Sequence, residues 1–236
     1  MKITQDIWIS LLRREKRSFL FVFFALALAS FALSPASLAQ LPSPAPDGGY
    51  PGNNTAEGDG ALQNVTPGVE NDGGIGNTAV GFRALFNNTF GSSNTANGFQ
   101  ALNNNTTGND NTATGTNALF NNAGYENTAN GVCALYHNTT GSYNTANGPF
   151  ALSSNTNGSW NTANGGYVLI NNTDGNFNTA NGAEALYHNT TGSYNTANGP
   201  NALFNNTNGS FNTANGYLRS NSTQLASTTR PAVPPR

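Results

Sequence analysis

The sequence predicts an all-β fold, a parallel β-solenoid of about nine to ten coils of 17 residues each. Three observations predict it: a repeated motif, a fixed period, and a density of Gly and Asn that leaves no room for a long helix. Seven of the nine intervals between successive motifs are 17 residues, one is 16 and one is 23. The motif is Asn-Thr-Ala-x-Gly, and it begins at Asn54, Asn77, Asn94, Asn111, Asn127, Asn144, Asn161, Asn178, Asn195 and Asn212.

Aligned on this first Asn, the unit reads N-T-A-x-G-x-x-A-L-x-x-N-T-x-G-x-x, and we number its positions 1 to 17. Residues at one position in successive coils form a column. Gly and Asn supply the positive φ angles that tight corners need, so we expect two short strands per coil joined by two turns. Stacked coils lie about 4.8 Å apart, so the Asn side chains of columns 1 and 12 are expected to form hydrogen-bonded ladders.

Column 9 is the largest apolar column of the repeat. Adjacent residues of a strand point to opposite faces, so columns 8 and 9 cannot both face the coil interior unless the chain bends between them. The sequence therefore predicts that column 9 is either a core ladder or an oligomer ladder, and that one of these two columns lies in a homo-oligomer interface. Column 9 contains Leu62, Leu85, Leu102, Leu119, Leu135, Leu152, Leu169, Leu186 and Leu203.

The chain outside the repeats divides into three segments. Residues 1–39 predict a secretory signal peptide, because a basic start precedes the apolar residues 19–33 and Ser37-Leu38-Ala39 fits a small-x-small cleavage site. An uncleaved N-terminal anchor is the alternative, and only this segment is expected to contact a membrane. Residues 40–53 read as a proline-rich linker, 54–218 as the repeat domain and 219–236 as a disordered tail. We expect a secreted or cell-surface protein.

Charge and the scarcity of reactive side chains limit the function. Only 8% of the residues are charged, and no basic residue occurs between Arg83 and Arg219, so nucleic-acid binding is not expected. Cys133 is the only cysteine and lies at a variable position, which suggests an exposed thiol or a pairing between chains. His137 and His188 lie three coils apart, too far to share a metal ion. We expect no catalytic, cofactor-binding or metal-binding residues and no enzymatic activity.

The motifs resemble a known family. Short glycine-rich coils of the form [ST]-x-A-x-G after an Asn, behind a signal peptide, resemble the YadA-like head repeats of trimeric autotransporter adhesins. The resemblance covers residues 54–218 and implies a left-handed β-roll, a side-by-side homotrimer, and attachment to cells, matrix or glycans. The unit here is longer than the usual head unit, and it carries Thr-Ala or Asn where that family has Val or Ile.

Column 17 changes character along the chain and is the candidate ligand-binding stripe. We assign Glu70, Ser93, Asp110 and Glu126 to its first four units. The next five residues form what we call the aromatic stripe, which would run about 20 Å at the strand spacing. Packing under a turn or against another chain is one reading, and an exposed face for an extracellular protein or a glycan is the other. The stripe is Tyr143, Trp160, Phe177, Tyr194 and Phe211.

Two functions stay open at the level of sequence. The first is an adhesion protein that presents repetitive polar and aromatic faces. The second is an ice- or crystal-surface binder, because column 2 is Thr in every unit and Asn recurs beside it in column 4. A broken aromatic stripe is also expected in column 10, at Phe86, Phe120, Tyr136, Tyr187 and Phe204, with Ile170 within it.

Overall fold

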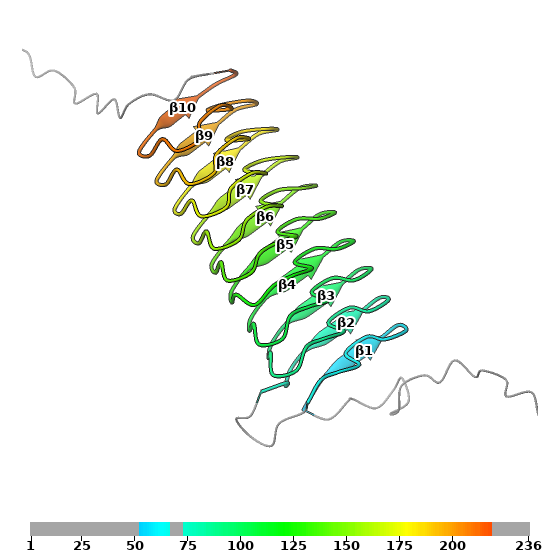
Figure 1. The fold of residues 1–236 in the computed structure, drawn as a ribbon. Helices are drawn as coiled ribbons and strands as arrows, with labels where there is room; N and C mark the ends of the chain where they lie inside the picture. The colour runs from blue at the N-terminus through cyan, green and yellow to red at the C-terminus, as the bar shows by residue number, and fades with distance from the viewer. Residues whose placement is uncertain (1–51, 67–72, 219–236) are drawn as a thin grey trace, which may run out of the picture. The chain divides into compact units, whose positions relative to one another are not determined.

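The computed structural model describes residues 52–66 and 73–218, which form one stack of coils (Figure 1). The predicted signal peptide, the tail, residues 40–51 of the linker and Glu70 lie outside the described residues. The described part contains ten strands, one per coil, and the coils of units 2 to 9 are complete within it. The strands are β1 Thr55–Glu57, β2 Thr78–Val80, β3 Thr95–Asn97, β4 Thr112–Thr114, β5 Thr128–Asn130, β6 Thr145–Asn147, β7 Thr162–Asn164, β8 Thr179–Asn181, β9 Thr196–Asn198 and β10 Thr213–Asn215.

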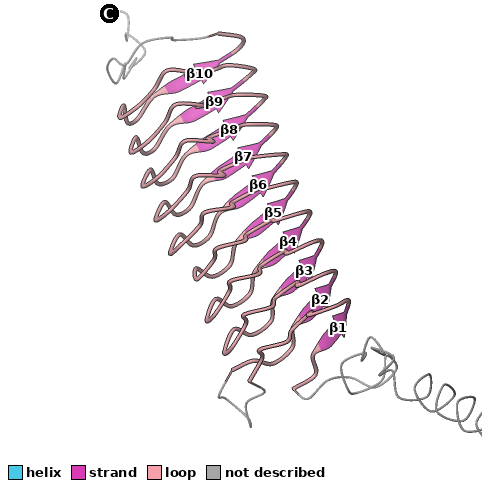
Figure 2. Ribbon diagram, turned by 45° about the vertical axis from the view of Figure 1, so that its right-hand side comes forward, coloured by secondary structure: helices cyan, strands magenta, loops and turns pink. Residues whose placement is uncertain are grey.

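The ten strands form one parallel sheet in chain order, and like residues face each other across every pair. In β6 and β7, Thr145 pairs with Thr162 and Asn147 with Asn164. The strands line one wall of the stack and loops make the remainder (Figure 2). This architecture confirms the predicted parallel β-solenoid.

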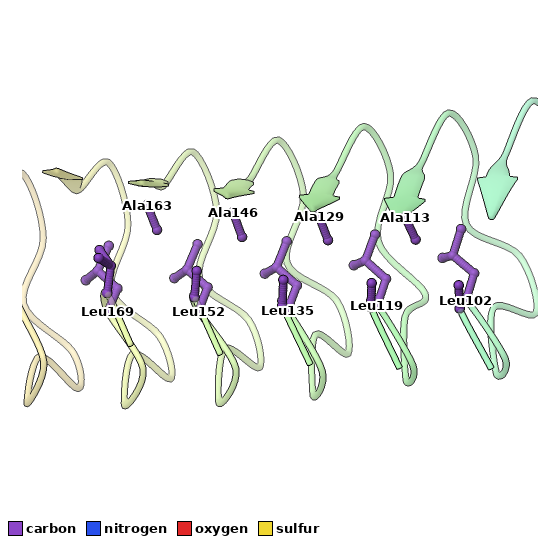
Figure 3. Close-up of a cluster of buried hydrophobic side chains, with 14 of the residues drawn as sticks. Leu102, Ala113, Leu119, Ala129, Leu135, Ala146, Leu152, Ala163 and Leu169 are labelled. Carbon is purple, nitrogen blue, oxygen red and sulfur yellow. The ribbon is translucent and has the colours of Figure 1, made fainter. Parts of the chain in front are cut away.

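The core lies inside each coil and is formed by columns 3, 8 and 9. In a representative coil, Ala146, Ala151 and Leu152 have no exposed surface. Figure 3 shows the leucines of column 9 meeting the strand alanines between the two walls of the stack. Columns 8 and 9 therefore both face inward within a single chain.

The wall opposite the strands differs from the expected second strand. Its coils are joined by backbone hydrogen bonds, such as Leu152 N–H to the Val168 carbonyl at 3.0 Å, but they form no regular strand. The residues at positions 7 and 9 adopt left-handed conformations, with φ of 58° at Phe150 and 52° at Leu152. This double bend breaks the extended strand, and it turns both Ala151 and Leu152 into the core. Our premise that one of these columns needs a partner chain was therefore wrong.

The asparagine ladders of columns 1 and 12 are present and converge on one carbonyl in each coil. In unit 7, the side-chain amide nitrogens of Asn161 and Asn172 both donate to the carbonyl of Gly175, at 2.8 and 3.0 Å. Each also donates to the side-chain oxygen of its equivalent in the preceding coil: Asn161 to Asn144 at 3.1 Å, and Asn172 to Asn155 at 2.8 Å. We call this arrangement the asparagine node. It satisfies buried amides that would otherwise destabilise so thin a core.

The irregular units leave the sheet intact, and the 16-residue unit also keeps the whole node, whereas the first unit keeps only its column 1 Asn. The 16-residue unit loses one residue between positions 12 and 15, yet Asn111 and Asn122 still donate to the Gly124 carbonyl, at 2.9 and 2.8 Å. In the 23-residue first unit, Asn54 donates to the Gly74 carbonyl at 2.7 Å. The extra residues therefore fall between Thr66 and Gly74 in the sequence, mostly outside the described residues.

Candidate binding surfaces

The aromatic stripe lies at the corner where each coil enters its strand. Its backbone is left-handed, with φ between 55° and 61°, so the side chains project from the corner and do not enter the core. The five rings stack on one another in register. Successive ring centroids lie 4.1, 6.1, 4.9 and 4.9 Å apart from Tyr143 to Phe211, and the interplanar angles are 9° or less.

The aromatic stripe is largely open to solvent. Trp160, Phe177, Tyr194 and Phe211 expose between 46% and 66% of their surface, whereas the core side chains of these coils expose almost none. The solenoid core is complete without them. The stripe is thus a continuous apolar ridge on the outer surface, and such patches mark interaction sites more often than chance.

Stacking decides which parts of the rings a ligand can reach. Both faces of Trp160, Phe177 and Tyr194 are turned toward neighbouring rings, so the ridge presents mainly ring edges. A sugar inserted between two rings needs a gap of about 7 Å, which is twice a carbon–carbon contact distance. The widest centroid separation is 6.1 Å. The repeated face-to-face stacking of sugars along the stripe is therefore not available.

The N-terminal part of column 17 is polar, and one residue of it was misassigned from the sequence. Ser93, Asp110 and Glu126 occupy the column with φ of 55–58°. The Ser93 N–H donates to the Ile75 carbonyl at 2.9 Å, which places Ile75 in column 16 of the first unit. Gly76, which immediately precedes Asn77, is therefore the column 17 residue of that unit, in the place that we assigned to Glu70. The insertion hid this register, since its extra residues cannot be placed by spacing alone.

The acidic and aromatic parts of column 17 meet at Glu126 and Tyr143. The charge of Glu126 raises the pKa of Tyr143 above its ordinary value. Desolvation, a side-chain hydrogen bond to Glu126 and the electrostatic effect of Tyr125 raise this pKa further, by smaller amounts. The neutral phenol is therefore favoured at physiological pH. The N-terminal end of the stripe thus carries a carboxylate, whereas its C-terminal end at Phe211 is apolar.

Other aromatic side chains form shorter stacks. In column 10, Phe120 pairs with Tyr136 at 5.2 Å and Tyr187 with Phe204 at 5.0 Å, as expected for a broken stripe. Columns 6 and 7 contain two pairs that the sequence reading missed. These are Phe82 with Phe99 at 5.2 Å and Phe150 with Tyr167 at 5.3 Å. None of these stacks extends beyond two rings.

The outward face of the sheet is a second candidate surface, which we call the threonine face. Column 2 places a Thr on each strand and column 4 places Asn on seven, while the Ala between them points inward. From Asn130 to Asn215 the Asn side chains form a ladder, with each amide nitrogen donating to the next oxygen at 2.8–2.9 Å. Within the described ranges, the column 2 hydroxyls have no hydrogen-bond partner. Column 13 differs, since Thr156 Oγ1 donates to the Thr173 carbonyl at 2.9 Å.

The remaining candidate side chains are dispersed. Cys133 is a half-buried free thiol, and His137 and His188 pack edge-on against Tyr136 and Tyr187. Residues 52–66 and 73–218 contain no group of three His, Cys, Asp or Glu side chains able to hold a metal ion. No helix in these ranges is long and apolar enough to cross a membrane.

One shallow feature had no sequence signal. An open hollow of about 470 Å³ lies on the coils that follow the insertion. It is lined by the apolar side chains of Ile75 and Phe90 together with Asp110. It is open to solvent on one side. Gly73, which follows the insertion, also lines it.

Comparisons of the chain with protein-family models, with curated proteins and with solved structures give no match. The parallel β-solenoid is therefore the level at which this chain is classified.

Proposed function

We propose that this is a secreted or cell-surface attachment protein, whose solenoid presents the aromatic stripe to an extracellular partner. The observation that carries the proposal is the ridge of five stacked rings, four of them 46–66% exposed, on a domain whose core is already complete. The resemblance of the repeats to adhesin heads supports the same role. A predicted signal peptide supports export.

The shape of the stripe favours a protein partner over a free sugar. Ring edges form a narrow apolar line that carries the hydroxyls of its two tyrosines, and it fits a groove or a flat apolar strip with polar groups on another macromolecule. Stacked rings lose little conformational freedom on binding, because their neighbours already hold them. Among the described residues, a glycan could stack only on the outer ring faces of Tyr143 and Phe211, at the two ends of the stripe.

The proposal is tested by binding of the full exported chain to arrays of immobilised extracellular proteins and glycans. The test variant is Trp160→Ala with Phe177→Ala, which breaks the stripe at its centre. The matched control is Phe150→Ala with Tyr167→Ala. This control removes a stacked pair in the same two coils, also at left-handed positions, but at another corner.

Binding to an array protein that the control retains and the test variant loses would support the proposal. Equal binding by both variants would place the ligand elsewhere and contradict it. Selective loss of glycan binding alone would retain the stripe as the site but overturn the protein preference.

A second candidate function rests on the threonine face. Ten Thr residues in register carry hydroxyls that bond nothing in the described chain, at a spacing of about 4.8 Å between strands and about 7 Å between columns 2 and 4. A rigid lattice of this kind can match a crystalline surface such as ice. The Asn ladder of column 4 restrains its side chains and so adds to the regularity.

Thermal hysteresis of the purified protein in freezing water separates the two functions. A lattice binder would show a gap between freezing and melting that Thr162→Tyr, in the centre of the face, abolishes. The control Thr107→Tyr, on an exposed turn, should leave that gap unchanged. Absence of hysteresis in the wild type would remove this candidate.

A further inference from the structure

Two nearly identical hexapeptides occupy different environments in the stack. Residues 155–160 read Asn-Thr-Asn-Gly-Ser-Trp and residues 206–211 read Asn-Thr-Asn-Gly-Ser-Phe. Each contains an Asn-Gly pair at positions 14 and 15. The first lies in the interior of the stack, whereas the second lies in the last complete coil (Figure 1).

An Asn-Gly pair can modify itself in water. The glycine amide nitrogen gives its proton to water or hydroxide and attacks Cγ of the Asn side chain. The Cγ–Nδ2 bond then breaks and releases ammonia, which leaves a five-membered succinimide. Water opens the ring to aspartate or isoaspartate. Glycine favours the attack because it has no Cβ to hinder it and permits the required backbone rotation.

The interior pair is held against this reaction by the next coil. The N–H groups of Asn157 and Gly158 both donate to the Thr173 carbonyl, at 3.0 and 3.1 Å. The Asn157 side-chain nitrogen, which would leave as ammonia, donates to Asp174 Oδ1 at 2.7 Å. The attacking nitrogen, the backbone and the leaving group are thus all restrained.

The terminal pair lacks every one of these restraints. Among the residues that the structure describes, no acceptor bonds the N–H of Asn208, the N–H of Gly209 or the Asn208 side-chain nitrogen. Asn157 Oδ1 accepts from one hydroxyl, that of Thr140 at 2.8 Å, whereas Asn208 Oδ1 accepts from two, those of Thr190 and Thr191 at 2.9 and 3.1 Å. This oxygen gains negative charge when Cγ is attacked, so both hydroxyls stabilise the developing anion.

We propose that Asn208 is a site of spontaneous succinimide-forming deamidation in the folded protein, and that stacking protects the equivalent Asn157. Opening of the terminal turn costs least because nothing in the described chain stacks on it. The product places a carboxylate three residues before Phe211 of the aromatic stripe in the sequence. It also perturbs Gly209, whose carbonyl accepts the amides of Asn195 and Asn206 at 2.8 and 2.9 Å.

The test compares the two sites within one sample. The full exported chain is incubated at neutral pH and 37 °C in heavy-oxygen water, which marks products formed during incubation, and is then mapped by peptide mass spectrometry. In the native protein we expect Asn157 to convert more than about ten-fold more slowly than Asn208. In denaturant the two should convert at similar rates, because their local sequences match. Circular dichroism confirms that the native sample stays folded.

Equal native rates at the two sites would overturn the proposal, as would faster conversion at Asn157. A difference that persists in denaturant would assign the effect to sequence and not to stacking, which also overturns it. Asn208→Ala identifies the product peptide by its loss. The outcome is independent of whether the aromatic stripe binds a partner.

Discussion

At the scale of single residues, the coil places side chains in conformations that their intrinsic preferences oppose. The Leu of column 9 has φ near +50° in every coil, a region that costs a non-glycine residue about 1–2 kcal/mol. Full burial of a Leu contributes about 1.5–3 kcal/mol, so packing offsets the strain. The left-handed conformation of these leucines is therefore stabilised by their burial in the core, and no local sequence pattern predicts it.

Column 15 requires glycine for lack of space, and mutation can test this requirement. A Cβ on Gly158 would lie 2.5 Å from the Gly175 carbonyl oxygen and 2.7 Å from Asn172 Nδ2, inside the asparagine node. We expect Gly158→Ala to lower the free energy of unfolding by about 2–4 kcal/mol, because buried amides lose partners. Urea unfolding followed by circular dichroism measures it.

The matched control is Gly166→Ala in the next coil. A Cβ there would meet nothing closer than 3.6 Å, and the residue has no positive φ. Its stability should change by no more than about 0.5 kcal/mol. Equal losses of stability in the two variants would mean that the asparagine node is not the reason why column 15 requires glycine.

At the scale of elements, chemically identical threonines have different roles on different walls. Thr156 in column 13 donates its hydroxyl to the following coil, whereas Thr162 in column 2 points outward without a hydrogen-bond partner in the described part of the chain. Only the first hydroxyl contributes to folding. In column 2 the branched side chain favours the strand, and the hydroxyl is left available for recognition.

Valine substitutions separate these roles because valine keeps the branched shape. Thr156→Val should cost about 1 kcal/mol of stability, the net value of one hydrogen bond. Thr162→Val should change stability by less than about 0.5 kcal/mol. Matching shifts of the urea midpoints in the two variants would show that column 2 threonines also make a stabilising bond.

The sequence correctly predicted the elements in which one residue type recurs at the same position of every coil. The Asn ladders and the strand at Asn-Thr-Ala followed from identical residues at a fixed period. The second strand did not form, because left-handed residues at Phe150 and Leu152 bend the chain. The stripe was found by its register, but its exposed edges depend on ring orientation, which spacing does not encode. Gly76 was missed because an insertion breaks the count.

At the scale of the whole molecule, the buried leucine column changes what an oligomer would require. Each coil completes its core within one chain, so column 9 cannot form an interface between chains. A homotrimer remains a prediction from the family resemblance. If it forms, only outer columns are available to it, and among the described residues the aromatic stripe is the longest unbroken stack of rings.

The oligomeric state therefore distinguishes an interface from a ligand site. We expect sedimentation velocity to give the same mass for the wild type and for Trp160→Ala with Phe177→Ala, because the proposed partner is a different molecule. Dissociation of a wild-type oligomer by this double substitution would assign the stripe to contacts between chains and remove it as a ligand site.

The most direct test of the account is the comparison of two double variants on the array of extracellular proteins. Trp160→Ala with Phe177→Ala should lose at least about ten-fold in affinity for the partner, since each exposed aromatic anchor is worth roughly 1 kcal/mol or more. Phe150→Ala with Tyr167→Ala should bind as the wild type does. Equal retention by both variants, with both folded, would contradict the claim that this solenoid attaches through its aromatic stripe.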